Sequence, residues 1–189
     1  PPHMSTTGKE TVAPGAFKRA VTEFRDRIAA DGTSFPPVDG RYVLVVANAC
    51  PWCHRVLIML HLKGIAHLFT IVNVASFMGA EGWTFTEDEP FPGESWTKIR
   101  EVYFAAKPDY ANRFSVPVIW DKKTRTIVSN ESSEIIRFLN TAFNSIAKNP
   151  EYDSCPPALL AGIDAMNDRV YNSVNNGVYR CGFAKSQAA

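Results

Sequence analysis

The segment Cys50-Pro51-Trp52-Cys53 constrains the fold of this chain more than any other segment. It follows residues 42–47, an apolar run typical of a buried strand, and it precedes residues 55–64, which have the pattern of a helix. A Cys-x-x-Cys motif between a strand and a helix is typical of a thioredoxin-like fold. Cys50 then lies at the helix N-terminus, where free N–H groups stabilise a thiolate and can lower the thiol pKa from about 8.5 to roughly 3.5–7.5. We therefore interpret Cys50 as a nucleophile rather than an inert buried thiol.

Cys53 has two interpretations that the sequence leaves open. It can act as a resolving thiol that attacks a mixed disulfide on Cys50, or it can be a small packing residue. A zinc site is disfavoured, because one Cys-x-x-Cys supplies two ligands and a structural site needs about four. Cys155 and Cys181 stand alone, and the histidines show no paired ligand spacing. We therefore expect no metal.

The composition excludes several classes of partner. The 189 residues are 46% hydrophobic and 21% charged, which is ordinary for a globular protein. The net charge of +1 argues against nucleic acid or an anionic membrane as the main partner. No apolar run approaches the ~18 residues of a membrane span, and residues 1–16 have no apolar signal-peptide core. Four cysteines are too few for a disulfide scaffold, so we expect a reducing, cytoplasmic compartment.

The central part of the chain has the pattern β-α-β-α-β-β-α, which is the thioredoxin-like arrangement. We expect strands over 41–47, 67–74, 116–120 and 126–128, and helices over 51–63, from about Trp96, and after a cap at Asn130. Gly64 is expected to end the first of these helices. Residues 75–93 have no clear periodicity and predict a long loop, a feature that is often functional.

The flanking segments divide the chain further. Residues 1–16 predict a flexible tail that begins with a cloning remnant, and Phe17, Val21, Phe24 and Ile28 predict a short amphipathic helix. We assign residues 17–147 to the thioredoxin-like domain. Residues 148–189 predict a linker and then a helix from the apolar spacing of 159–174. The fold class is therefore α/β, followed by the start of an all-helical domain that the chain cuts short.

Two further motifs lie where such a fold binds its substrate. Val116-Pro117 precedes a strand, and we expect a cis peptide bond there that turns the Val116 backbone toward a thiol peptide. Residues 130–133, Asn-Glu-Ser-Ser, open a helix whose free N–H groups can hold a carboxylate. Ser132 can donate to that carboxylate and Glu131 can accept from an ammonium, and a γ-glutamyl group carries both charges. Simple helix capping is the alternative for this motif.

Several isolated residues have weaker signals. Trp83 in the long loop can wall a substrate pocket, although an isolated aromatic residue is more often packing. Arg100 and Arg113 can pair with ligand carboxylates, although a single surface arginine is more often solvated. Arg55 can add positive charge near Cys50 or point to solvent.

A family resemblance covers almost the whole chain from Tyr42 onward. Its blocks are Cys50-Pro51-Trp52-Cys53-His54-Arg55, Gly82-Trp83-Thr84-Phe85, Val116-Pro117-Val118-Ile119-Trp120-Asp121-Lys122-Lys123, Ile127-Val128-Ser129-Asn130-Glu131-Ser132-Ser133-Glu134-Ile135-Ile136 and Val174-Asn175-Asn176-Gly177-Val178-Tyr179-Arg180. Together they resemble the glutathionyl-hydroquinone reductases, which are the Xi class of glutathione transferases.

The resemblance implies a thioredoxin-like domain, a helical domain, a homodimer and glutathione as co-substrate. It implies that Cys50 attacks a glutathionyl-hydroquinone, releases hydroquinone and holds glutathione as a mixed disulfide, which a second glutathione then reduces. The residues that it implies for glutathione binding are Trp83, Arg113, Val116 with Pro117, Glu131, Ser132 and, more weakly, Arg100.

Two departures from the family bear on this expectation. The usual motif is Cys-Pro-Trp-Ala, so Cys53 replaces an alanine and moves the site toward glutaredoxins and omega-class transferases. The hydroquinone pocket of the family uses tyrosines late in the helical domain, which this chain does not include. We therefore expect a thiol transferase acting on glutathionyl-hydroquinones or mixed disulfides of small molecules or proteins. The alternatives are a dithiol oxidoreductase using Cys50 and Cys53, and a non-catalytic glutathione-binding redox sensor.

Overall fold

The computed structural model describes residues 21–32 and 34–184, and its chain divides into two units. The first unit is Thr22–Ser154, and the segment that begins at Cys155 belongs to the second. The tail expected over residues 1–16, and the first part of the expected N-terminal helix, lie outside the described residues.

A mixed four-stranded sheet forms the centre of the first unit, in the order β2-β1-β3-β4. β1 (Tyr42–Val46) pairs in parallel with β2 (Phe69–Asn73) and antiparallel with β3 (Val118–Asp121). β3 continues through a hairpin into β4 (Thr126–Ser129), which lies at the edge of the sheet. All five residues of β1 are buried, because both faces of this central strand are covered.

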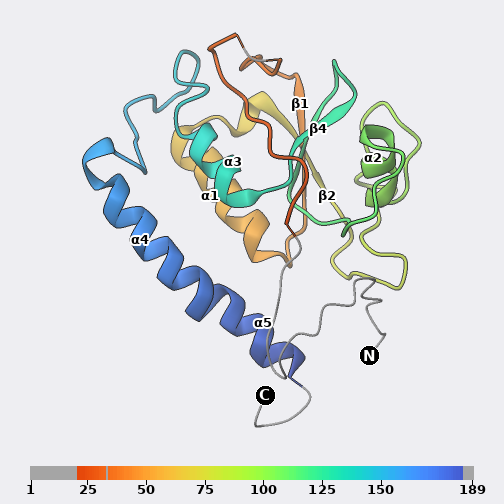
Figure 1. Ribbon diagram of the computed structural model, residues 1–189. Coiled ribbons are helices and arrows are strands. Elements are labelled where there is room, and N and C mark those ends of the chain that lie inside the picture. Colours follow the sequence, from red (N-terminus) through yellow and green to blue (C-terminus); the bar gives the residue numbers. More distant parts are fainter. Residues whose placement is uncertain (1–20, 33, 185–189) are drawn as a thin grey trace. The chain divides into compact units, whose positions relative to one another are not determined.

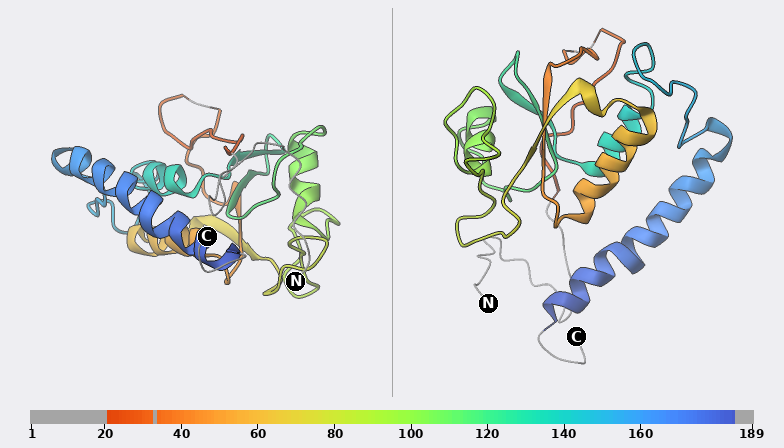
Figure 2. Two further views of the ribbon diagram at one scale, coloured as in Figure 1. Left: turned by 60° about the horizontal axis from the view of Figure 1, so that its bottom comes forward. Right: turned by 180° about the vertical axis from the view of Figure 1, so that it is seen from behind.

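Three helices cover the two faces of this sheet. α1 (Pro51–Lys63) and α3 (Ser132–Leu139) lie side by side on one face, and α2 (Ile99–Ala106) lies on the other (Figures 1 and 2). The element order, with a short 3-10 turn η1 (Ala66–Leu68) before β2, is the expected β-α-β-α-β-β-α. The predicted α/β fold class is therefore confirmed.

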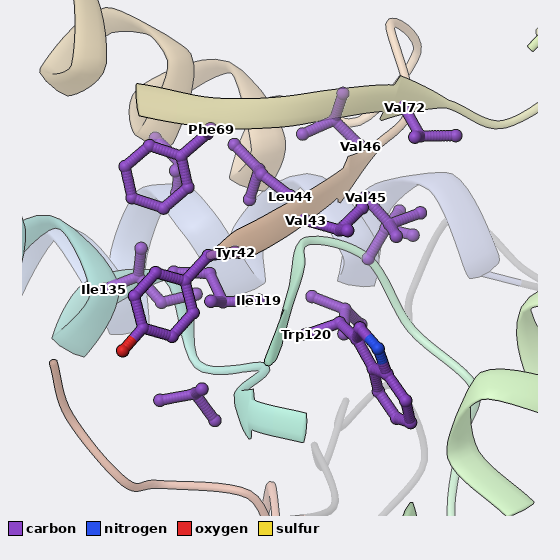
Figure 3. Close-up of a cluster of buried hydrophobic side chains, with 14 of the residues drawn as sticks. Tyr42, Val43, Leu44, Val45, Val46, Phe69, Val72, Ile119, Trp120 and Ile135 are labelled. Atoms are coloured by element: carbon purple, nitrogen blue, oxygen red, sulfur yellow. The ribbon is translucent and has the colours of Figure 1, made fainter. Parts of the chain in front are cut away.

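The hydrophobic core forms on both sides of β1 because successive side chains of a strand point to opposite faces. Figure 3 shows this set, with Tyr42 beside Phe69 and with Trp120 on a different side of the strand. The ring centroids of Tyr42 and Phe69 are 6.2 Å apart, and those of Phe69 and Phe143 are 5.2 Å apart. Trp120 instead packs edge-on against Trp96, which precedes α2 rather than beginning it as expected.

The predicted end of the first helix at Gly64 is confirmed. Gly64 has a φ of 65°, the left-handed conformation that glycine adopts readily, and its N–H donates to the carbonyls of the last helical turn. A Cβ atom at this position would lie 2.7 Å from the Cβ of Lys148. Glycine is therefore needed at position 64 for two reasons: it adopts the left-handed conformation, and it leaves room for the Lys148 side chain.

Residues 149–154, which we expected to be part of a linker, belong to the first unit and contact its helices. The Asn149 N–H donates to the Lys63 carbonyl at 3.2 Å, and the fully buried Lys63 ammonium donates to the carbonyls of Pro150 and Tyr152 at 3.1 and 2.8 Å. Ser154 donates through its N–H and hydroxyl to the Asn140 side-chain oxygen. This segment is thus held to the ends of α1 and α3.

The expected N-terminal helix is wrong where the structure describes it. Residues 24–26 run in an extended conformation along β4: the Asp26 N–H donates to the Val128 carbonyl at 3.0 Å and the Asn130 N–H to the Phe24 carbonyl at 3.1 Å. The edge of the sheet offers unpaired backbone groups that these residues satisfy. Ile28 is fully buried and Phe24 is partly buried, whereas Val21 is exposed, so the apolar spacing predicted the burial of only part of this segment and did not predict its conformation.

The second unit is helical, as the apolar spacing of residues 159–174 predicted. It contains a 3-10 turn η2 (Pro157–Leu159), α4 (Leu160–Val170), a π-helical turn η3 (Tyr171–Asn175) and α5 (Asn176–Phe183). Among the residues that the structure describes, no helix is both long enough and apolar enough to cross a membrane.

Candidate active site

Cys50 is the N-cap residue of α1. Its backbone is extended, with φ −100° and ψ 113°, and its carbonyl accepts from the N–H groups of Cys53 and His54 at 3.0 and 3.1 Å. Pro51 occupies the first helical position, as its fixed φ favours, and the first turn carries no acidic residue. The partly buried Cys50 thiol therefore lies at the positive end of a helix dipole that no neighbouring carboxylate of that turn offsets.

The expected cis peptide bond between Val116 and Pro117 is confirmed. Cys50 Sγ lies 3.6 Å from the Val116 carbonyl oxygen, so the two motifs meet although they are far apart in the sequence. The Val116 side chain is buried and fixes this backbone beside the thiol.

The loop before Val116 has a buried support that sequence reasoning missed. The Tyr103 hydroxyl donates to the Ser115 carbonyl at 2.7 Å and accepts from the Asn130 side-chain nitrogen at 3.0 Å. Burial raises the pKa of Tyr103 to about 12, so the hydroxyl remains a donor at neutral pH. In the sequence Tyr103 is indistinguishable from an ordinary apolar-face residue of α2, so no local signal reveals this contact.

Cys53 has a different environment from Cys50. It is fully buried, and the Ala47 N–H donates to its sulfur at 3.4 Å. A hydrogen bond with Cys50, together with burial, raises the pKa of the Cys53 thiol. Cys53 therefore remains protonated and can donate its S–H to a thiolate at Cys50.

The N-cap of α3 is Glu131, and the expected cap at Asn130 is wrong. Glu131 Oε1 accepts from the Ser133 N–H at 3.1 Å and from the Ser133 hydroxyl at 2.8 Å. Asn130 is 5% exposed and its amide is turned inward to Tyr103, which removes it from the helix end. Capping thus uses one carboxylate oxygen of Glu131, and the other accepts a longer bond of 3.4 Å from Thr22.

Arg55 joins α1 to the start of α3. The sequence alone left open whether this side chain adds charge near Cys50 or points to solvent. Its Nε and a terminal nitrogen donate to the Ser132 hydroxyl oxygen at 3.2 and 2.7 Å. The same guanidinium lies 3.8 Å from a Glu131 carboxylate oxygen and 4.7 Å from the centre of the Trp52 ring. Of the predicted site residues, the structure thus links Cys50 to Val116 directly, and joins Glu131 and Ser132 through Arg55.

Trp83 and Arg100 have other partners, and Arg113 is exposed. Trp83 is half-buried, and its carbonyl accepts from the Ile99 N–H at 3.0 Å in the folded loop before α2. Arg100 forms an ion pair with Glu81 at 2.6 Å. The Arg113 side chain is exposed and forms no ion pair with a residue in the described part of the chain.

The described residues contain no group of three or more histidine, cysteine, aspartate or glutamate side chains arranged for a metal ion. None of the four cysteines is in a disulfide bond. The position of Cys50 at a helix N-terminus, with a buried thiol and a backbone carbonyl beside it, supports thiol chemistry.

Comparison with known proteins defines the class of this site. Residues 49–142 match the family model described as "Glutathione S-transferase, N-terminal domain". This part of the chain is therefore a glutathione S-transferase N-terminal domain, and its thioredoxin-like fold is the one described above.

The proteins similar to this chain have more specific names. The Escherichia coli protein named "Glutathionyl-hydroquinone reductase YqjG" is 46% identical over 189 residues, which cover 93% of this chain and 56% of that protein. The crystal structure of the glutathione S-transferase Xi from Phanerochaete chrysosporium matches with a TM-score of 0.85 at 46% identity, over 91% of this chain and 60% of that one. The glutathione-bound structure of YqjG from Escherichia coli matches with a TM-score of 0.81 at 43% identity, over 92% and 58%. The homologues of this chain thus include glutathionyl-hydroquinone reductases and Xi-class glutathione transferases, and the chain spans less than two thirds of their length.

Proposed function

We propose that the protein is a glutathione-dependent thiol transferase that reduces glutathionyl-hydroquinones or glutathione mixed disulfides. The Cys50 thiolate attacks the glutathione sulfur of the substrate and forms a sulfur–sulfur bond to it. With a glutathionyl-hydroquinone, the carbon–sulfur bond breaks, its electron pair stays on the ring carbon, and a proton from solvent completes the hydroquinone. With a mixed disulfide, the leaving group is the thiolate of the partner. A second glutathione thiolate then attacks the bound glutathione sulfur, which releases glutathione disulfide and restores Cys50.

The site residues have distinct proposed roles toward glutathione. The Val116 backbone beside the cis Pro117 would pair with the peptide backbone of glutathione, next to the Cys50 sulfur. Glu131 would accept from the γ-glutamyl ammonium, and Ser132 would donate to its carboxylate. We propose Trp83 and Arg113 as additional contacts. Arg100 is the weakest of these proposals because Glu81 already occupies its guanidinium.

The observation that carries the proposal is the unequal environment of the two cysteines. Cys50 is the N-cap residue of a helix and is partly exposed, whereas Cys53 is fully buried and held protonated next to it. The test is deglutathionylation by the full-length protein. Cys50→Ser is expected to abolish it, and Cys181→Ser, which alters an exposed cysteine of the second unit, is expected to retain it. Retained turnover by Cys50→Ser would remove this mechanism.

A dithiol oxidoreductase is the second candidate, and the contact between Cys50 and Cys53 favours it. In this cycle Cys53, after losing its proton, attacks the Cys50 sulfur of the mixed disulfide and releases glutathione, leaving an intramolecular disulfide. Cys53→Ser separates the two cycles. Loss of protein-disulfide reduction with intact deglutathionylation would support the dithiol role, and tight glutathione binding without any turnover would instead indicate a redox sensor.

We further propose the setting in which the protein works. Glutathione is its co-substrate, its partners are glutathionylated small molecules or proteins, and the full-length protein is a cytoplasmic homodimer. Four cysteines in 189 residues are too few for a disulfide scaffold, which supports a reducing compartment. We also propose residues 17–147 as the glutathione-binding domain and 148–189 as a linker with the first helical part of a second domain.

A further inference from the structure

We propose that Arg55 is a positioning residue that makes the Ser132 hydroxyl an obligatory hydrogen-bond donor, and thereby makes the γ-glutamyl subsite selective for a carboxylate. This inference rests on the proposed function, because it concerns the same glutathione site. Arg55 lies on α1, the helix that begins after Cys50, and its side chain reaches Ser132 at the start of α3.

The hydrogen bonds around Ser132 support this role. A serine hydroxyl has one proton to donate and two lone pairs that accept. Arg55 donates to this oxygen through two nitrogens, at 3.2 and 2.7 Å, so both lone pairs are used. The hydroxyl proton is then the remaining hydrogen-bonding function of Ser132, and it can only donate.

The position of Arg55 is fixed by contacts on three sides. The guanidinium lies over the Trp52 ring, approaches Glu131 at 3.8 Å and donates to Ser132. The planar guanidinium presents its donors as a rigid fork, which the single ammonium of a lysine does not reproduce. Ser132 itself is 4% exposed, so its hydroxyl cannot easily exchange this partner for water.

The chemical consequence is a preference for a charged acceptor. Hydrogen bonds with an ionised partner are roughly twice as strong as neutral ones. Ser132 is the first residue of α3, where free N–H groups also favour an anion. A γ-glutamyl α-carboxylate can accept from both the Ser132 hydroxyl and the free N–H groups of α3. An α-carboxamide offers only a neutral oxygen as acceptor. Its own N–H groups would find no free lone pair on the Ser132 oxygen.

The test compares glutathione with its analogue in which the γ-glutamyl α-carboxylate is an amide. Dissociation constants are measured by calorimetry on the full-length protein with Arg55→Met, which keeps an apolar stem for Trp52, and with Arg55→Lys, which keeps the charge. We expect both variants to lose about tenfold in the preference for glutathione, a factor that corresponds to about 1.4 kcal/mol. Arg27→Met is the control, because Arg27 forms an exposed ion pair with Asp31, and the preference of this variant should be that of the wild type.

Three results would overturn the proposal. A wild-type preference in Arg55→Met, with or without a lower melting temperature, would reduce Arg55 to a structural contact between α1 and α3. A wild-type preference in Arg55→Lys would show that charge alone suffices and that the fork is not required. Failure of the wild-type protein to bind glutathione would overturn the proposed function itself, a result distinct from the other two.

Discussion

The sulfur of Cys50 lies 3.6 Å from the carbonyl oxygen of Val116. This contact joins the start of α1 to the residues just before β3, which are far apart in the sequence. Each partner is held by a separate support. Helix α1 fixes Cys50 as its N-cap, and the hydrogen bond from Tyr103 to Ser115 fixes the backbone before Val116. The geometry at the thiol therefore depends on Tyr103 as well as on helix α1.

Removing the Tyr103 hydroxyl is expected to destabilise the protein. Tyr103→Phe leaves the Ser115 carbonyl and the Asn130 amide without their partner in a buried region, which costs about 1–3 kcal/mol of unfolding free energy. Chemical denaturation measures this loss. Tyr171→Phe, at an exposed position of the second unit, is the control and should change little; an unchanged stability in Tyr103→Phe would contradict the assigned support.

The buried tyrosines predict a loss of stability at alkaline pH. Burial raises the pKa of both Tyr42 and Tyr103 to about 12, above the pKa of about 10 in an unfolded chain. Their contribution is therefore complete below pH ~10 and is lost as the pH rises toward 12. Unfolding free energy measured against pH should fall across this window, and less steeply in Tyr103→Phe. A flat profile up to pH 12 would refute this.

Cys53 is expected to tune the reactivity of Cys50 by donating its S–H. In Cys53→Ala the donor is lost, and a hydrogen bond worth about 0.7 kcal/mol predicts that alkylation of Cys50 by iodoacetamide slows about threefold at acidic pH, where the thiolate fraction limits the rate. Cys53→Ser keeps a donor and should stay nearer to the wild type. Equal rates in wild type and Cys53→Ala would show that the buried thiol is packing only.

Alanine substitutions at Gly64 and Gly40 can be compared to measure how closely Lys148 packs against the end of α1. Both have positive φ values, 65° and 66°, but a Cβ at Gly64 meets Lys148 at 2.7 Å whereas one at Gly40 meets nothing within 4 Å. Gly40→Ala is expected to lose about 1 kcal/mol for the backbone conformation. Gly64→Ala should lose about 1–3 kcal/mol more, because Lys148 must move. Equal losses would mean that this contact is not rigid.

Lys63 is expected to hold residues 149–154 in place. Lys63→Met fills the same buried space but leaves the carbonyls of Pro150 and Tyr152 without their donor. Removing a buried charge also relieves its desolvation, so the change in global stability is expected to be small. Hydrogen exchange should instead rise locally over residues 149–154, and unchanged protection there would contradict the assigned contact.

The sequence was sufficient for the parts of the fold in which local pattern and tertiary packing agree. The apolar run of β1, the helix after Pro51, the stop at Gly64 and the cis bond at Val116-Pro117 all have local signals that the structure satisfies. The residues that the site brings together, such as Cys50 and Val116, also came from these motifs.

Other features depend on contacts that no local pattern encodes. The segment around Phe24 had a helical spacing, yet pairing with the edge strand β4 determined its conformation. Asn130 is a good capping residue, but the inward contact with Tyr103 left the cap to Glu131. Arg55 was ambiguous because its partner, Ser132, lies on another helix.

The central claim is that Cys50 carries glutathione as a mixed disulfide. It is tested most directly by the intact mass of the full-length protein after treatment with glutathione disulfide. We expect the wild type to gain one glutathionyl group at Cys50 and Cys50→Ser to gain none at this position. A wild-type protein that only loses two hydrogens would indicate a Cys50–Cys53 disulfide and the dithiol cycle, and a wild-type adduct that peptide mapping places on a cysteine other than Cys50 would contradict the claim.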